Sequence, residues 1–143
     1  MLIGIGYKHL EARKTMFEKF SKFIPFGTFI HSTCWIDPTA IIEMGCFIYP
    51  GCIIDKKVII RANTTINIST TISHDSVIES HCFLSPRIAI AGFVKIHELC
   101  FIGINTTIID NLTIAKNTFV GAGSVVIKSI EKRDCMLEIR QNL

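Results

Sequence analysis

An aliphatic residue recurs at every sixth position over most of this chain. The series consists of Ile24, Ile30, Ile36, Ile42, Ile48, Ile54, Ile60, Ile66, Ile72, Ile78, Leu84, Ile90, Ile96, Ile102, Ile108, Ile114, Val120 and Val126. A period of six fits neither the turn of an α-helix nor the simple alternation of a long strand. It is typical of a solenoid in which a short strand and a corner repeat, with three units closing one coil. The spacing therefore predicts an all-β fold, a parallel β-helix.

The residue two positions before each aliphatic site is usually small. These residues are Cys34, Ala40, Cys46, Cys52, Val58, Thr64, Thr70, Ser76, Cys82, Val94, Cys100, Thr106, Thr118 and Ser124. Side chains two apart on a strand point to the same face, so both positions point inward and the residue between them points out. We therefore expect a core of stacked aliphatic ladders. Five of the six cysteines lie at the small position, where packing is favoured over disulfides or zinc.

Length and composition are those of a single globular domain, with 143 residues, 49% of them hydrophobic and 19% charged. The net charge of +3 is small and scattered, which argues against a nucleic acid partner but suits an anionic cofactor. The sequence has no apolar stretch long enough for a membrane span, and charges interrupt its opening residues where a signal peptide needs an apolar region. We expect a cytoplasmic protein without a metal site, since no paired Cys/His spacing occurs.

The repeat divides the chain into three regions. Residues 1–27 precede it, and we expect a strand at Leu2–Ile5, a turn at Gly6 and an amphipathic helix from about Leu10 to Phe23. Residues 28–128 form the solenoid, without an insertion that would break its register. Residues 129–143 form a charged tail, in which Cys135 to Arg140 is expected to be a short helix or strand that caps the last coil.

Because one coil takes 18 residues, positions 18 apart are expected to stack about 4.8 Å from each other. One outward column consists of Phe29, Phe47, Thr65, Phe83, Phe101 and Phe119. Five aromatic rings on one face are a liability for a monomer, so we expect them to be buried against another subunit. A homotrimer is the simplest such assembly. The alternative, coverage by the N-terminal helix, is expected to account for only one or two rings.

A second column occupies a corner of the predicted coil and consists of His74, Gly92, Asp110 and Lys128. His74 follows a predicted strand at a position without a packing role. Gly92 lies one coil above it, where the missing side chain allows a backbone N–H to approach a ligand closely. A neutral imidazole can take the proton of an attacking amine or hydroxyl, and an N–H can stabilise a thioester oxyanion. The corner is therefore a candidate acyl-transfer site, although lone histidines are more often structural or solvated.

Several motifs, in this order, resemble those of the hexapeptide-repeat sugar acyltransferases. They are Ser73-His74-Asp75, Leu84-Ser85-Pro86, Ala91-Gly92, Phe101-Ile102-Gly103 and Val120-Gly121-Ala122-Gly123-Ser124. More narrowly, about residues 1–130 resemble the sialic acid O-acetyltransferase and bacillosamine-type amino-sugar N-acetyltransferase family, with a shortened N-terminal domain. The resemblance implies a left-handed parallel β-helix, a homotrimer with active sites between subunits, and acetyl-CoA as acyl donor without a metal.

The resemblance also implies roles for individual residues. His74 corresponds to the general base of the family, and Asp75 either orients it or caps the turn. Gly92 corresponds to the glycine whose amide meets the acetyl carbonyl. The other expected cofactor-binding residues are Gly103, Gly121, Ala122 and Gly123 along the pantetheine arm and Lys128 at a phosphate. The expected substrate-binding residues are Asn67 and Phe83. Corner geometry alone is an alternative explanation for Gly121 and Gly123.

The sequence thus predicts an acetyl-CoA-dependent acetyltransferase acting on an amino or hydroxyl group of a sugar, expected to be nucleotide-linked, for surface polysaccharide or glycan synthesis. The alternative is a noncatalytic trimeric β-helix subunit, or a truncated family remnant that lacks the acceptor-binding domain. A carbonic-anhydrase-like zinc enzyme on the same scaffold is disfavoured, because His31, His81 and His97 do not form the histidine set of such a site.

Overall fold

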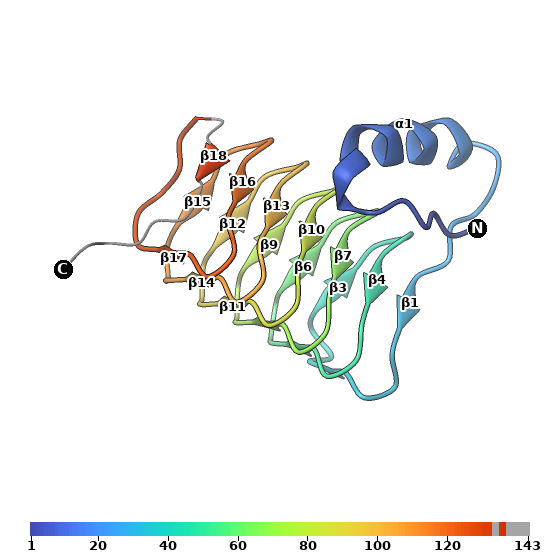
Figure 1. Cartoon of the computed structure of the whole chain (residues 1–143). Coiled ribbons are helices and arrows are strands. Elements are labelled where there is room, and N and C mark those ends of the chain that lie inside the picture. Colours follow the sequence, from blue (N-terminus) through green and yellow to red (C-terminus); the bar gives the residue numbers. More distant parts are fainter. Residues whose placement is uncertain (133–134, 137–143) are drawn as a thin grey trace.

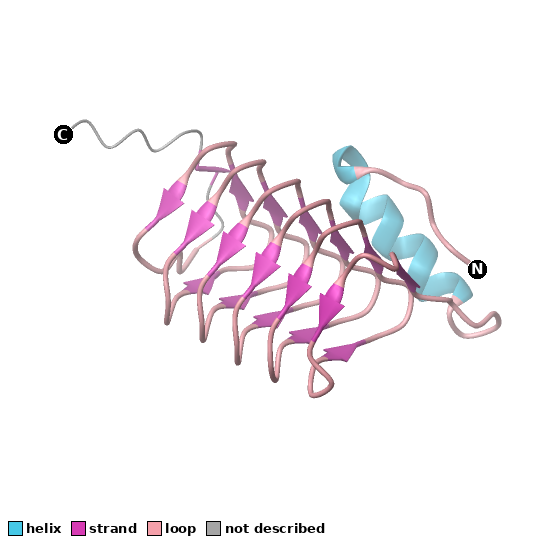
Figure 2. Cartoon of the chain, turned by 90° about the horizontal axis from the view of Figure 1, so that it is seen from below, coloured by secondary structure: helices cyan, strands magenta, loops and turns pink. Residues whose placement is uncertain are grey.

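The computed structural model describes residues 1–132 and 135–136 and shows a left-handed parallel β-solenoid with one helix at its N-terminal end (Figure 1). Each coil contributes a two-residue strand to each of three parallel sheets, so every strand pairs with the strand one coil later. Figure 2 shows the strands stacked into ladders along the solenoid. The fold class that the six-residue period predicted is confirmed.

The three sheets are named here by their strands. Sheet A contains β1 (Phe29–Ile30), β4 (Phe47–Ile48), β7 (Thr65–Ile66), β10 (Phe83–Leu84), β13 (Phe101–Ile102), β16 (Phe119–Val120) and β18 (Cys135–Met136). Sheet B contains β2 (Trp35–Ile36), β5 (Ile53–Ile54), β8 (Thr71–Ile72), β11 (Ala89–Ile90), β14 (Thr107–Ile108) and β17 (Val125–Val126). Sheet C contains β3 (Ile41–Ile42), β6 (Ile59–Ile60), β9 (Val77–Ile78), β12 (Lys95–Ile96) and β15 (Thr113–Ile114).

The register confirms the stacking of positions 18 apart, since Phe83 pairs with Phe101 and Ala89 pairs with Thr107. The tail follows a different spacing, because Cys135 of β18 pairs with Phe119. Cys135–Met136 is thus a strand on the last coil, one of the two forms expected for this segment. The rest of that expected segment, 137–140, lies outside the described residues.

The core contains the predicted ladders and shows why cysteine, threonine and serine alternate at the small inward position. The aliphatic side chains from Ile48 to Val126 are almost fully buried. At the small position, a thiol or hydroxyl donates to the carbonyl fifteen residues later, as Cys46 does to Arg61 and Thr64 does to Glu79. Burial raises the pKa of the Cys46 thiol to about 11, so this side chain stays a neutral thiol. The prediction that these cysteines serve packing is confirmed.

Each corner is a tight turn with one residue in the left-handed region. Non-glycine residues with positive φ recur every six residues from Lys57 to Asn117, among them Asp75 with φ 58°. Asparagine occupies four of these positions, as its short polar side chain tolerates this conformation best. The corners therefore hold their outward side chains at fixed positions along the solenoid.

The N-terminal segment lies over the outer face of sheet A (Figure 1). It contains a 3₁₀ turn, η1 (Tyr7–His9), and the helix α1 (Leu10–Phe20). The predicted strand at Leu2–Ile5 is wrong, because this segment runs across the face of a sheet, where no free backbone groups offer a ladder. Ile3 instead packs with Phe17 and Phe26.

The helix also ends three residues earlier than predicted. The N–H groups of Phe23 and Ile24 both donate to the carbonyl of Phe20, which closes the helix in a turn. Pro25 disfavours helical backbone at the residue before it. Phe23 consequently lies outside the helix and is 80% exposed.

The aromatic column on sheet A is covered in its middle by this N-terminal segment. The Tyr7 ring lies 5.6 Å from that of Phe83 and 4.9 Å from that of Phe101. The guanidinium of Arg13 lies over the ring of Phe47. The chain's own N-terminal segment thus contacts three rings, more than the one or two expected of it, and leaves them half-buried. Phe29 and Phe119, at the two ends of the column, remain exposed.

Candidate functional site

His74 lies at the corner between sheets B and C, directly after β8. Its side chain is 40% exposed, so the imidazole is accessible to a ligand while still held by its neighbours. His74 and Asp75 are the two central residues of the corner turn, and Asp75 has the positive φ of that position. The predicted placement of His74 just after a strand is confirmed.

The carboxylate of Asp75 fixes the tautomer of His74. Its Oδ2 lies 3.1 Å from Nδ1 of the imidazole. An ionised carboxylate only accepts hydrogen bonds, so Nδ1 carries the proton and Nε2 keeps its lone pair. Lys57, one coil earlier, lies 4.0 Å from the other oxygen of Asp75. Asp75 therefore orients His74 and leaves its Nε2 free to accept a proton.

Gly92 lies directly over the imidazole. A Cβ added to this glycine would lie 2.7 Å from Cε1 and 2.9 Å from Nε2 of His74. Atoms at such distances would clash, so only glycine leaves this space free. The Gly92 N–H donates to no acceptor among the described residues, whereas its carbonyl accepts from Asn111. Gly92, whose N–H has no acceptor among the described residues, thus stacks on His74, as the spacing of 18 residues predicted.

Phe93 is a neighbour of His74 that the sequence reasoning missed. Its ring meets the imidazole edge to face, with 5.2 Å between centroids, and is itself 55% exposed. A sequence signal existed, since Phe93 occupies the left-handed corner position, where a bulky aromatic side chain is rare. The ring shields one side of the base and leaves an apolar surface beside it.

A hollow of about 350 Å³ lies on sheet B next to this corner. Ser73, Ala91 and Asp110 line it together with residues of β8, β11 and β14. Asp110 and Lys128 follow His74 and Gly92 along the same corner, at 18-residue intervals. By the spacing of parallel strands, Lys128 lies about 14 Å from His74 along the solenoid.

Lys116, a further lysine near the last coils, does not belong to this corner. It lies at the corner between sheets C and A, where Glu98 pairs with it and with Lys14. Two ammonium groups lower the pKa of the Glu98 carboxyl, and the pKa of Lys116 is raised in turn. Its charge is thus already paired within the chain, with a carboxylate that it shares with Lys14.

The other predicted site residues lie away from His74 within one chain. Asn67 and Gly103 follow β7 and β13, at the corner between sheets A and B, as do the residues 121–123. One side of the coil, about 15–20 Å of chain, separates this corner from His74. Phe83 lies on sheet A against Tyr7. A single chain therefore brings together His74, Asp75, Gly92 and Lys128 along one corner and leaves the second set at another.

Several residues of this second set have a structural explanation. A Cβ on Gly103 would lie 2.5 Å from the backbone nitrogen of Ala122, so the coil above requires glycine here. The Gly121 carbonyl accepts from Ser124, and Gly123 has the positive φ of a corner residue. The Asn67 side chain accepts from the N–H of Ile68 and caps its own turn.

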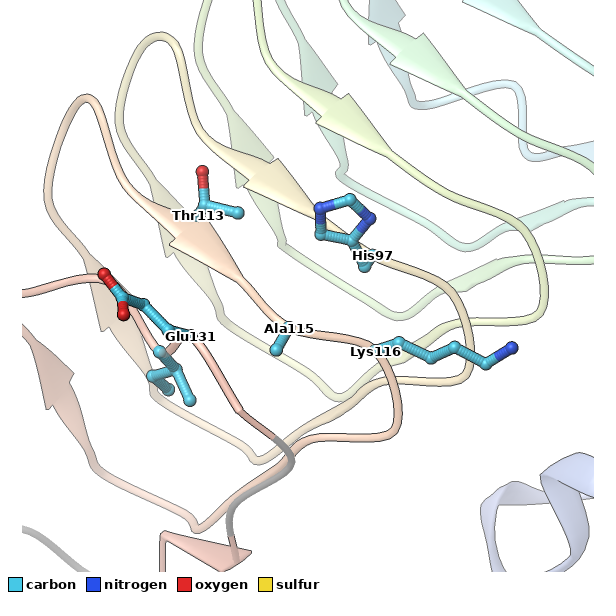
Figure 3. Close-up of a pocket in the computed structure, with 6 residues that line it drawn as sticks. His97, Thr113, Ala115, Lys116 and Glu131 are labelled. Carbon is cyan, nitrogen blue, oxygen red and sulfur yellow. The ribbon is translucent and has the colours of Figure 1, made fainter.

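A further hollow, of about 420 Å³, lies on sheet C near the last coil (Figure 3). The hollow is lined by His97, Thr113, Ala115, Lys116, Ile130 and Glu131.

Within residues 1–132 and 135–136, no three His, Cys, Asp or Glu side chains gather as metal ligands would. No helix of the same residues has both the length and the hydropathy of a membrane span.

Fold and corner together define a class, the hexapeptide-repeat solenoids that carry a histidine at a coil corner. No protein-family profile and no curated protein matches the chain. Several solved structures do match this chain. The GDP-perosamine N-acetyltransferase of Caulobacter crescentus, crystallised with CoA and GDP-perosamine, is 26% identical over 85% of this chain and 58% of that one, with a TM-score of 0.83. In that crystal structure a single histidine is replaced by alanine.

A second crystal structure of the Caulobacter crescentus enzyme, determined with the same two ligands, is 25% identical over 85% of this chain, with a TM-score of 0.82. The acetyltransferase domain of PglB from Neisseria gonorrhoeae, in complex with acetyl coenzyme A, shares the fold at 21% identity, 86% coverage and a TM-score of 0.83. The resemblance to hexapeptide-repeat acetyltransferases indicated by the sequence motifs is confirmed. The chain spans 58% of the length of the first of these relatives.

Proposed function

We propose that this protein is an acetyl-CoA-dependent acetyltransferase that acts on an amino or hydroxyl group of a sugar, most simply a nucleotide-linked one, for glycan synthesis in the cytoplasm. One observation carries the proposal: the His74 imidazole, whose Nδ1 lies 3.1 Å from Asp75, lies under Gly92, where the missing side chain leaves room beside Nε2. The crystallised relatives named above, which bind CoA and a nucleotide sugar, support the substrate classes.

In the proposed reaction, Nε2 of His74 takes the proton from the acceptor amine or hydroxyl as it attacks the thioester carbonyl. The Gly92 N–H donates to the oxyanion that forms on that carbonyl. Collapse of the intermediate breaks the carbon–sulfur bond, and the proton on His74 passes to the departing CoA thiolate. Asp75 stabilises the imidazolium between the two proton transfers. CoA supplies the acetyl group and the leaving thiol.

The cofactor is proposed to lie along the corner that carries Gly92, Asp110 and Lys128. Its thioester would lie near His74 and its phosphates near Lys128. The separation of about 14 Å suits an extended pantetheine arm. Lys128 is exposed, and its ammonium suits a phosphate oxygen as a point charge.

We further propose that the complete site forms between copies in a homotrimer. Asn67, Gly103 and the residues 121–123 lie at the far edge of sheet B in one chain, so in the proposed trimer they would approach His74 from a second copy. The outer face of sheet B carries exposed Trp35, Ile53 and Val125, a suitable apolar surface for such contact. This face replaces the aromatic column of sheet A as the proposed interface.

The test is release of CoA from acetyl-CoA with a panel of nucleotide amino sugars and neutral nucleotide sugars. We expect turnover that falls at least about a hundredfold in His74→Ala, because removal of a positioned base costs about 10²–10⁴-fold. The matched control His97→Ala, at another corner, should keep its activity. Hydroxylamine treatment of the product distinguishes an ester from an amide. Absence of turnover with every acceptor would favour the noncatalytic subunit instead.

Mixing two inactive variants tests the shared site. His74→Ala and Asn67→Ala chains assembled together should regain about a quarter of wild-type activity, because one site in four then receives both intact residues from different copies. Light scattering should give three times the monomer mass. No regain of activity in a verified mixed trimer would place the whole site within one chain.

A further inference from the structure

Arg13 is a buried charge that acetyl transfer does not use. It projects from α1 onto sheet A and is 1% exposed, the most buried charged side chain among the described residues. Its Nε donates to Asn63 Oδ1 at 3.0 Å, and one terminal nitrogen donates to Thr65 Oγ1 at 2.6 Å. The guanidinium also lies over the ring of Phe47. Thr65, the single polar residue of the aromatic column, makes room for it.

The charge of this guanidinium is uncompensated by the described residues. None of their ion pairs involves Arg13. Its second terminal nitrogen, Nη2, is buried and has no hydrogen-bond partner among them. Burial lowers the pKa of Arg13 but leaves an arginine charged. A buried charge without a counter-ion is unfavourable, so an anion beside Nη2 would be favoured.

A small pocket of about 120 Å³ lies at this arginine. Gly4, Gly6, Tyr49 and Thr65 line it together with Arg13 and apolar side chains, and Arg13 is the only charged residue in that lining. The backbone N–H groups of residues 4–6 donate to no acceptor in the described part of the chain. Thr65 accepts from Arg13, so its hydroxyl proton is free to donate. The lining thus contains the side-chain donors Arg13 and Thr65 and no carboxylate.

We propose that this pocket is a binding site for an oxyanion, a phosphate or carboxylate group, with Arg13 as its counter-ion. The pocket has room for one such group and is too small for a nucleoside. One oxygen of the anion would accept a hydrogen bond from Nη2 of Arg13. A second would accept from a hydroxyl or amide of the pocket, and hydrogen bonds between arginine and an anion are charge-assisted. The site lies over sheet A, whereas the acetyl-transfer corner lies between sheets B and C.

The experiment is an NMR titration of the wild-type protein with inorganic phosphate and, separately, with acetate, at constant ionic strength in chloride. We expect the Arg13 Nε–H and the Gly4 and Gly6 amides to shift together and saturate with one dissociation constant. The anion with the lower dissociation constant shows whether the pocket prefers a phosphate or a carboxylate group. Shifts that do not saturate, or that spare all three groups, would overturn the proposal and assign Nη2 to water.

Variants test the role of the charge. Arg13→Gln should weaken phosphate binding at least about tenfold, since a hydrogen bond to a charged group contributes about 1.5–3 kcal/mol. Lys19→Gln, an equal charge change on the exposed side of α1, should change it less than about twofold. If Arg13→Gln fails to fold, Gly4→Glu serves instead, because a Cβ at Gly4 meets no atom within 4 Å. Its carboxylate should abolish the response to phosphate, and unchanged affinity would contradict the site.

Discussion

The substitution Gly92→Ala tests the candidate site most directly. The added Cβ would lie 2.7 Å from Cε1 and 2.9 Å from Nε2 of His74, whereas ordinary contacts begin near 3.4 Å. The imidazole must therefore move by at least about 0.7 Å to relieve the contact at Cε1, which its partial exposure allows. Misplacement of a catalytic group by about 1 Å can cost about a hundredfold in rate. Alanine keeps the N–H of residue 92, so the loss would come from displacement of the base.

The expected result is a fall of about a hundredfold in kcat for acetyl transfer, with a free energy of unfolding within about 1 kcal/mol of wild type. Gly92 does not have a positive φ, so alanine adds no backbone strain there. Gly27→Ala is the matched control, because a Cβ at Gly27 meets nothing within 4 Å.

Two results would refute this reasoning. If Gly92→Ala keeps more than half of the wild-type kcat, the space over His74 is not used in the reaction. If Gly92→Ala still reduces activity when His74 is already alanine, residue 92 acts independently of the base. The double variant His74→Ala/Gly92→Ala should have the same residual rate as His74→Ala alone.

Three further predictions follow from individual contacts. Gly103→Ala should lower the free energy of unfolding by about 1–3 kcal/mol in chemical denaturation, because its Cβ would meet backbone 2.5 Å away that cannot move aside; an unchanged midpoint would contradict the close approach of the coils. Burial lowers the pKa of His81, whose Nδ1 accepts from Asn63, so stability should fall as pH drops through about 6.5, the unfolded value. His81→Asn, which suits the positive φ of this corner, should flatten that pH dependence, and an equally steep profile would assign it to another group. Lys128→Glu should weaken acetyl-CoA binding by about tenfold in calorimetry, more at low salt than at high salt, and a salt-independent loss would place the cofactor phosphates elsewhere.

The candidate site could be read from the sequence to the extent that it depends on stacking. Gly92 follows His74 by one coil, so the period of the repeat alone placed it over the imidazole. The sequence left the role of Asp75 open, because an aspartate can either cap a turn or orient a neighbouring histidine. The 3.1 Å contact between Asp75 Oδ2 and His74 Nδ1 favours the orienting role.

The residues that the sequence assigned to one site lie at two corners, and the reason is physical. A spacing of 18 residues determines which residues lie above one another, but it says nothing about how side chains on different edges of a coil meet. Asn67 and Gly103 matched motifs at the corner between sheets A and B, while His74 lies between sheets B and C. Only the closed coil shows that these residues lie at different corners of one chain.

The sequence by itself determined the solenoid, because a six-residue period of aliphatic side chains leaves each coil one way to bury them. It also determined the order of the residues along each corner. Only the tertiary structure decided what covers sheet A, since the contact of Arg13 with Thr65 joins residues 52 positions apart, outside the repeat. Such a contact depends on how α1 packs on a finished surface, and no local pattern encodes it. The buried, unpaired guanidinium could therefore be recognised only in the folded chain.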